Sequence, residues 1–318
     1  HEEAQQKGVK IVNCVGFDSI PADIGVYHLL KQLPIQNESS WDQNSYVAVN
    51  GYVKLVMPGL ISYGTYHTVV TSLDNVSIFG SKNKKKRETQ SEKPKKKAVL
   101  NRSIRWEPSV NSYVIPFSTS DPTVVNRSAV LQKYVLDGKV DFQYAHFLQV
   151  EKWYNVLLFI LVALSLFLIT RFSWGASFLL KIWRQPGEGP SEENRKKSSC
   201  LMTFQGIAKL KQGIQTVTTN CTVAGDPGYD ETAKMALQST LCLLDTVDGE
   251  VKQNSMSTVD NGVMSTAAVF GDNIIKRLHE HSNVRFATKR STFTKNEESD
   301  FEKVKREASK YVYLPSST

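Results

Sequence analysis

One uninterrupted apolar run dominates the pattern of hydrophobic and polar positions along the chain. The 18 consecutive residues Trp153–Thr170 carry no charge, and a second apolar piece, Phe172–Leu180, follows Arg171. At about 1.5 Å per residue the first run makes a helix of roughly 27 Å, a little shorter than a hydrocarbon core of about 30 Å. Because apolar residues cover every face, the pattern favours a membrane-inserted helix over one buried in a protein core.

Aromatic rings and basic side chains gather at the ends of this run, as is typical of a membrane interface. We therefore predict a transmembrane helix, or one that dips into the membrane, at this place in the chain. The residues expected to contact lipid are Trp153, Tyr154, Leu157, Phe159, Leu161, Leu166, Phe167, Phe172 and Trp174.

The first residues of the chain indicate half of a doubly wound α/β unit. Val9–Val15 is apolar and rich in β-branched residues, which is typical of a buried strand. Gly16–Pro21 forms a turn, and Ala22–Leu33 has helical spacing up to Pro34. Ligands of such sheets bind beyond the carboxyl ends of the strands, which is where this turn lies.

Alternating and helical patterns continue on both sides of the apolar run. Strands are expected at Asn44–Val56, Ser112–Pro116, Phe142–Val150, Met202–Leu210 and Ile214–Val223. Helices are expected at Val124–Leu136, from a capping Asp230 to about Leu244, and at Gly271–His281. Gln185–Lys197 has the composition of an exposed linker, and Glu297–Tyr311 that of a charged tail.

Charge is distributed unevenly along the 318 residues. The net charge is +8, and Lys82–Lys97 alone holds nine Lys or Arg residues against two Glu, a surplus of seven. The rest is nearly neutral, which argues against a nucleic-acid-binding domain. Three interpretations of Lys82–Lys97 stay open: a solvated loop, a patch attracted to anionic lipid, or an import or nucleic-acid signal.

The sequence contains no clear motif for a metal site or a catalytic nucleophile. The cysteines, Cys14, Cys200, Cys221 and Cys242, are scattered without a C-x-x-C pair, so we predict free thiols and no metal site. No nucleophile with a neighbouring base can be identified, and the catalytic residues stay unknown. The histidines are expected to be surface or packed side chains: His28, His67, His146, His279 and His281.

Three motifs resemble the saccharopine dehydrogenase-like oxidoreductases. GFDSIPADIG at Gly16–Gly25 is similar to a signature of that family, and Gly225–Tyr229 to its later GPGY-type turn. Asn261–Gly271 is similar to its C-terminal motif, although Thr266 stands where the family usually has Pro. Over Gln5–Phe286 the resemblance implies an α/β fold, with a remnant of a Rossmann-type doubly wound unit, a mixed-sheet α+β domain and an inserted hydrophobic helix.

The resemblance also implies a cofactor and its place. The nicotinamide of NAD(P) would lie against the first turn, where glycine lets the backbone approach the ring and Asp18 or Ser19 could form hydrogen bonds. The expected cofactor-binding residues are Gly16, Phe17, Asp18, Ser19 and Pro21, and the expected substrate pocket holds Gly64, Thr65, Gly228 and Tyr229. The alternative is that these turns only begin helices.

The chain opens at His1, partway through the α/β pattern, and no G-x-G-x-x-G follows a strand. We therefore expect an N-terminally truncated chain that does not bind NAD(P) tightly and is inactive alone. The expected domains are a Rossmann remnant (1–36), the first part of an α+β domain with a basic loop at 81–98 (37–150), a membrane-associating insertion (151–184), a linker (185–200), the second part of the α+β domain (201–290) and a charged tail (291–318).

A single membrane crossing at the apolar run would place strands of one sheet on opposite sides of a bilayer. We therefore expect the run to enter and return, with Arg171–Gly175 near the surface, as a monotopic anchor on the cytosolic face of an endomembrane or on a lipid droplet. Two functions remain: a lipid-associated oxidoreductase with a lipid-related substrate, or a non-catalytic membrane-attached binding or structural protein that keeps the fold.

Overall fold

The computed structural model describes residues 1–34, 37–42, 45–59, 61–74, 99–117, 120–132, 140–183, 185–249, 252–254, 257, 260–295 and 312–313. The basic stretch Lys82–Lys97 and the expected charged tail at Glu297–Tyr311 lie outside the described residues. The lipid and nucleic-acid interpretations of Lys82–Lys97 therefore stay predictions.

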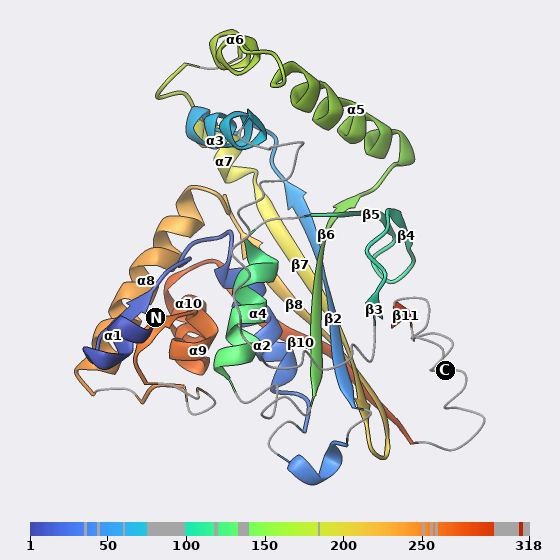
Figure 1. The fold of residues 1–318 in the computed structure, drawn as a ribbon, viewed down its shortest axis with the longest axis vertical. Helices are drawn as coiled ribbons and strands as arrows, with labels where there is room; N and C mark the ends of the chain where they lie inside the picture. The colour runs from blue at the N-terminus through green and yellow to red at the C-terminus, as the bar shows by residue number, and fades with distance from the viewer. Residues whose placement is uncertain are drawn as a thin grey trace.

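A seven-stranded mixed sheet forms the centre of the molecule (Figure 1), in the order β10-β8-β7-β2-β6-β5-β4. Its strands are β2 (Tyr46–Val56), β4 (Arg105–Glu107), β5 (Ser112–Pro116), β6 (Asp141–Val150), β7 (Ser199–Leu210), β8 (Gly213–Ala224) and β10 (Val284–Lys295). β2 and β6 run parallel, and the other neighbours are antiparallel. The mixed α/β fold class and the five predicted strands are confirmed.

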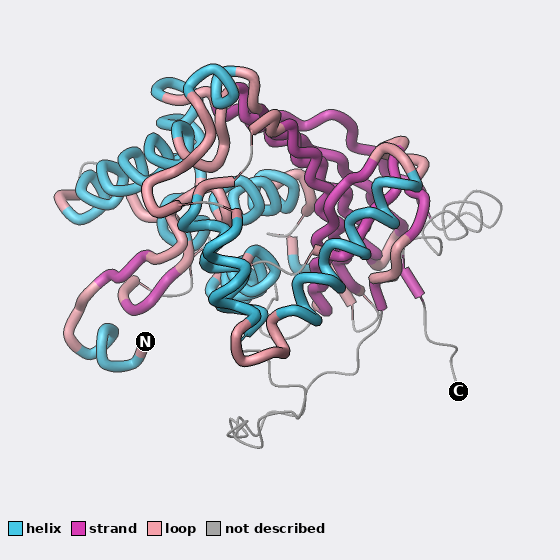
Figure 2. Tube along the Cα trace, turned by 90° about the horizontal axis from the view of Figure 1, so that it is seen from above, coloured by secondary structure: helices cyan, strands magenta, loops and turns pink. Residues whose placement is uncertain are grey.

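Among the described residues, helices cover one face of this sheet (Figures 1 and 2). The other face has no described helix on it, although Tyr46, Tyr52 and Phe147 form part of a buried cluster there. The covering helices are α2 (Ile20–Leu30), α4 (Asp121–Leu131), α8 (Asp230–Val247), α9 (Thr266–Phe270) and α10 (Asp272–His281). Short elements complete the described chain: α1 (Glu2–Gln6), the 3-10 turn Glu38–Ser40, and the two-stranded pair of β3 (Val99–Leu100) with β11 (Val312–Tyr313).

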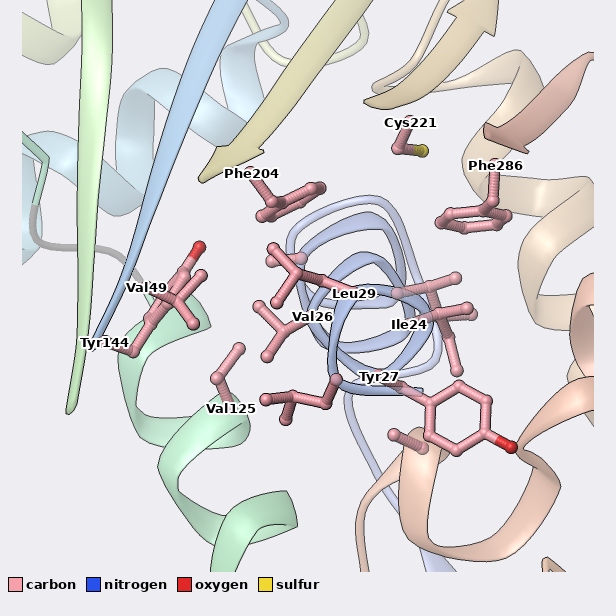
Figure 3. Packing of buried hydrophobic residues seen from close by; sticks show 14 of the residues in the cluster. Ile24, Val26, Tyr27, Leu29, Val49, Val125, Tyr144, Phe204, Cys221 and Phe286 are labelled. Atoms are coloured by element: carbon pink, nitrogen blue, oxygen red, sulfur yellow. The ribbon is translucent and has the colours of Figure 1, made fainter. Parts of the chain in front are cut away.

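The helix α2 lies at the centre of the main core, between the sheet and the other helices (Figure 3). Ten of its eleven residues are buried, so it has no solvent-facing side. Close approach to the sheet depends on Gly25, because a Cβ atom there would lie 2.2 Å from the ring of Phe204 on β7. The glycine that ends the first motif therefore allows α2 to pack closely against β7.

The predicted strand at Val9–Val15 forms only in part and is not buried. β1 (Lys10–Val12) pairs in parallel with β9 (Gly262–Met264), outside the main sheet. Val9 and Ile11 are 44% and 45% exposed, so the expectation of a buried strand was wrong. The apolar pattern correctly indicated a strand. Burial also needs neighbouring elements, and among the described residues β1 has one neighbouring strand, β9, on a single edge.

A second helical layer lies across the upper end of the sheet (Figure 1). It contains α3 (Tyr63–Asp74), α5 (Trp153–Ile169), α6 (Gly175–Ile182) and the short α7 (Glu192–Lys196). α7 lies within the segment 185–197 that we predicted to be a linker, where Ser191 caps it by accepting a hydrogen bond from the Asn194 amide.

The apolar run forms the exposed helix α5, and α6 follows it after a turn. Within α5 only Val156 is buried, whereas Leu158, Leu161 and Leu164 are 50% exposed or more. The prediction of a transmembrane helix is corrected, because none of the described helices is long and apolar enough to cross a membrane. The 17 residues of α5 end at Ile169, next to the charged Arg171.

Arg171 fixes the corner between α5 and α6. Its guanidinium donates hydrogen bonds to the carbonyl oxygens of Leu73 and Asp74, the last two residues of α3, and lies 4.9 Å from the ring centre of Phe167. A cation at the C-terminal end of a helix is stabilised by the helix dipole. Arg171 therefore ties the apolar return to the folded body.

Candidate functional site

The turn Gly16–Pro21, called the first turn below, contacts the starts of two helices, α4 and α8. The Phe17 amide donates to Thr232 Oγ1 in the first turn of α8 at 2.8 Å. Ser120, which precedes α4, donates to the Asp18 carbonyl oxygen at 3.3 Å. A Cβ atom on Gly16 would lie 2.7 Å from Thr232 Oγ1, so glycine permits this approach. The turn is thus held from both sides.

The predicted pocket residue Tyr229 joins α8 to α3. Its hydroxyl accepts a hydrogen bond from the Ser62 amide at 2.7 Å and lies 3.5 Å from Thr65 Oγ1. Partial burial raises the pKa of this phenol, but the hydrogen bonds from Ser62 and Thr65 outweigh burial, and the pKa is lowered from 10.0. Hydrogen bonds donated to a tyrosine oxygen stabilise its phenolate form, which lowers the pKa.

The structure therefore brings the predicted residues into two adjoining groups. Gly16, Phe17 and Ser19 lie with the starts of α4 and α8, and Thr65 and Tyr229 lie at the start of α3. Asp18, Gly64 and Thr65 are exposed, whereas Ser19 and Pro21 are buried. Gly228 is half-buried, with its Cβ position 4.0 Å from Asp226 Oδ1.

The N-termini of four helices thus surround this place, since α2, α3, α4 and α8 all begin at these contacts. Helix N-termini with free amides favour anionic groups. Here the amides of Phe17, Tyr229 and Ser62 already donate to acceptors within the chain, so these contacts hold the four helix starts together.

Asp226, four residues before α8, was missed as the side chain that accepts hydrogen bonds from the amides at the start of this helix. Its Oδ1 accepts hydrogen bonds from the amides of Tyr229 at 2.6 Å and Asp230 at 3.4 Å. Asp230, which we predicted to be the cap, instead pairs with Arg195 of α7 at 3.1 Å. Asp is a favoured residue around helix starts, and the sequence has two, Asp226 and Asp230, close together.

A buried carboxylate connects the first motif to the third. Asp23 on α2 is 1% exposed, and its Oδ2 accepts hydrogen bonds from Thr266 Oγ1 at 2.7 Å and the Ala267 amide at 2.8 Å. Its Oδ1 accepts from Ser128 Oγ on α4. Thr266, which departs from the family pattern, thus supplies a hydroxyl to Asp23 where proline could not.

A second buried polar group lies on the inner face of β6. His146 Nε2 is 3.3 Å from Asp121 Oδ2, and its Nδ1 is 2.6 Å from the Tyr144 hydroxyl. Burial lowers the pKa of His146 to about 4, so the ring is neutral at physiological pH. Both ring nitrogens have partners, which fits the predicted packed side chain.

Comparison with known proteins agrees with the motifs. The chain is 29% identical to the cow "Saccharopine dehydrogenase-like oxidoreductase" over 315 residues, which cover 92% of this chain and 68% of the relative. The human protein of the same name is 27% identical over 302 residues, covering 88% and 65%. The chain is thus similar to proteins named saccharopine dehydrogenase-like oxidoreductases. No protein-family model matches it.

Another relative carries a name that describes a location. The "Lipid droplet localized protein" of Caenorhabditis elegans is 26% identical over 302 residues, which cover 86% of this chain and 66% of the relative. The chain thus spans about two-thirds of the length of these relatives.

Saccharopine dehydrogenase-like oxidoreductases generally use NAD(P). In this chain the amides of Phe17, Ser19 and Ile20 donate to Thr232 or to the Gly16 carbonyl oxygen, so they are not available to a ligand. Asp18 is exposed, and Phe17 is half-buried.

Two sizeable cavities lie away from this turn. One, of about 410 Å³, is at the opposite end of the sheet beside Leu33, Leu210 and Phe293. The other, of about 510 Å³, lies on the face of the sheet opposite α2.

The described residues hold no cluster of three or more His, Cys, Asp or Glu side chains suited to a metal ion. The four cysteines are free, as predicted, and three of them are buried. Cys14, which the pattern placed in the buried first strand, is exposed and follows that strand with a positive φ of 57°.

Proposed function

We propose that this chain forms part of an oxidoreductase that works at a lipid surface, with the α5–α6 layer as its anchor and the first turn facing the nicotinamide of NAD(P). The observation that carries the proposal is the position of α3. Its first turn holds Tyr229 of the candidate site, and its body packs on α6.

Contacts along α3 support this link between site and anchor. The Tyr66 hydroxyl donates to the Leu179 carbonyl oxygen of α6 at 2.9 Å, and the Tyr66 ring meets Trp183 at 4.4 Å between ring centres. At its far end α3 accepts the hydrogen bonds of Arg171. A lipid-related substrate held near Thr65 and Tyr229 would thus lie one helix away from the lipid phase.

The exposed surface of α5 and α6 supports a lipid partner. Large apolar patches on a soluble surface are rare unless they bind something. Trp153, Tyr154, Phe172 and Trp174 are about half-exposed and lie at the ends of α5, where amphipathic rings suit a headgroup layer. Since α5 has no polar face, a lipid monolayer that can surround it suits it better than a shallow headgroup contact.

Flotation with artificial droplets, made of a triacylglycerol core and a phosphatidylcholine monolayer, tests the anchor. Leu161 and Leu164 on α5 are 60% and 50% exposed, and we expect the double substitution L161D/L164D to lower the floated fraction at least about tenfold, because burying each leucine stabilises by about 1.5 to 3 kcal/mol. The matched control is L237D/L244D on α8, where the exposures are 56% and 52%. Equal loss in both variants would contradict the proposal.

A fluorescence titration of NADPH tests the cofactor. We expect weak binding by this chain alone and tighter binding when it is joined to the part of the cow relative that this chain does not match. A bulky G16V substitution should weaken the joined protein, because any Cβ at this position meets Thr232. No binding by either protein would remove the enzyme function.

One observation favours the alternative, a non-catalytic membrane-attached binding or structural protein. The amides of the first turn are satisfied within the chain, as expected if the turn only begins α2. Droplet binding without NADPH binding by the joined protein would support this second function.

A further inference from the structure

The face of the sheet opposite α2 carries a polar hollow that the proposed function does not use. It has a volume of about 510 Å³ and is lined by side chains of β2, β6, β7, β8 and β10 and by the turn before β5. Small-molecule pockets typically measure about 300 to 1,000 Å³. This hollow therefore has the size of a ligand site, on the side of the sheet away from the first turn.

A β-bulge directs two consecutive cations into the hollow. The pairing of β10 with β8 passes from Thr288 opposite Thr219 to Arg290 opposite Thr218, which leaves Lys289 as the extra residue. In a regular strand neighbouring side chains point to opposite faces. Here Lys289 and Arg290 both line the hollow, because the bulge interrupts that alternation.

The charge of these cations is not balanced nearby. Among the described residues neither Lys289 nor Arg290 has a carboxylate within ion-pair distance of 4.0 Å. Lys54 at the rim is paired with Glu151 at 2.6 Å, so those two charges cancel. The hollow therefore keeps a surplus of about two positive charges, which suits one phosphate group.

The rest of the lining offers hydrogen bonds to hydroxyl groups. Thr203, Gln205, Thr218 and Asn220 present their side chains there. Asn220 Oδ1 is buried and has no hydrogen-bond partner among the described residues, and a buried acceptor of this kind calls for a donor. The described lining residues include no aromatic ring on which a nucleobase could stack.

We propose that this hollow binds a small phosphorylated polyol. Lys289 and Arg290 hold its phosphate, and the hydroxyl and amide groups of β7 and β8 bind its hydroxyls. A free sugar phosphate or glycerophosphate and the headgroup of a phospholipid share this chemistry. The proposal does not depend on NAD(P) use or on the α5–α6 anchor.

Calorimetric titration of the full chain with glycerol 3-phosphate tests the site, with glycerol and inorganic phosphate as reference probes. We expect glycerol 3-phosphate to bind more tightly than either reference, and K289Q/R290Q to weaken it at least about tenfold. Lys209 lies four residues beyond Gln205 on β7, on the same face but outside the lining, so K209Q is the matched control and should leave the affinity unchanged.

Competition then distinguishes the two sources. Displacement of glycerol 3-phosphate by phosphatidate vesicles assigns the site to a lipid headgroup, and lack of displacement assigns it to a free metabolite. The proposal is overturned if glycerol 3-phosphate does not bind, or if K289Q/R290Q and K209Q behave alike. It is also overturned if sedimentation shows a dimer that K289Q/R290Q dissociates, since a second copy would then cover this face.

Discussion

Two helices of this chain are apolar on every side, and they occupy opposite surroundings. In α2 ten of eleven residues are buried among the sheet and four other helices. In α5 only one of 17 residues is buried, although its composition is more apolar still. An all-round apolar helix must be surrounded by something apolar, but its sequence does not say whether that is protein or lipid.

The polar residues of α2 and α5 distinguish a helix surrounded by protein from one suited to lipid. α2 carries Asp23 in its middle, and three donors from α4 and the third motif satisfy that carboxylate. α5 carries no charge, and Arg171, two residues beyond its end, is bonded outside the helix to the end of α3. A buried charge with partners indicates a protein core, because lipid cannot supply those partners.

The largest expected difference between the two helices is in their response to truncation. L29A removes a fully buried side chain from α2 and should lower the free energy of unfolding by about 2 to 5 kcal/mol. L161A removes a side chain that is 60% exposed on α5 and should change it by less than about 0.5 kcal/mol. Urea unfolding without lipid measures both, and similar losses would mean that α5 is packed in the protein.

Acid should weaken the core around α2 and β6 through His146. Its folded pKa of about 4 lies below the unfolded value of 6.5, so the unfolded chain binds the proton first. Stability is therefore full above pH 6.5 and falls as the pH drops towards 4, by about 3 kcal/mol over that window. Urea midpoints at several pH values should show this loss in the wild-type chain and not in H146Q, which is less stable at neutral pH.

Glycine substitution compares a core helix with a surface helix. G25A places a Cβ 2.2 Å from Phe204 and should cost about 1 to 3 kcal/mol of unfolding free energy. G64A, in the first turn of α3, meets nothing closer than Ser62 Oγ at 3.9 Å and should be neutral or stabilising by up to about 1 kcal/mol. Thermal unfolding of both variants decides the matter, and a stable G25A would show that α2 packs less closely than described.

The smallest effect is expected where the site meets the anchor. Y229F removes the acceptor of the Ser62 amide and should cost about 1 kcal/mol. Hydrogen exchange should become faster at residues 62–66 but not in α2. Unchanged exchange at the start of α3 would show that Tyr229 does not hold this helix.

Much of the fold could be predicted from local patterns. β2, β6, β7 and β8 alternate or run apolar over ten or more residues, and a long period is hard to mistake. The burial of the first strand could not be predicted, because β1 finds its partner β9 about 250 residues later in the chain. The helix α7 was missed because its five polar residues have no apolar period.

The candidate site was predictable only as separate motifs. The turn at Gly16–Pro21 and the turn before α8 could be found in the sequence, but the bond from Phe17 to Thr232 joins residues 215 positions apart. Ser120 could be identified as part of a turn and cap, and Thr232 as part of the second motif, but neither pattern shows that both contact the turn Gly16–Pro21. Their role follows from which helices begin side by side.

The attachment of α5 to the sheet has a consequence for motion. β6 leads directly into α5 through Glu151 and Lys152, and Arg171 closes the other end, so the helix cannot swing freely from the body. On a droplet, such a protein would no longer tumble. It would drift in two dimensions and spin about the surface normal, and every encounter at the candidate site would occur at a constant height above the lipid.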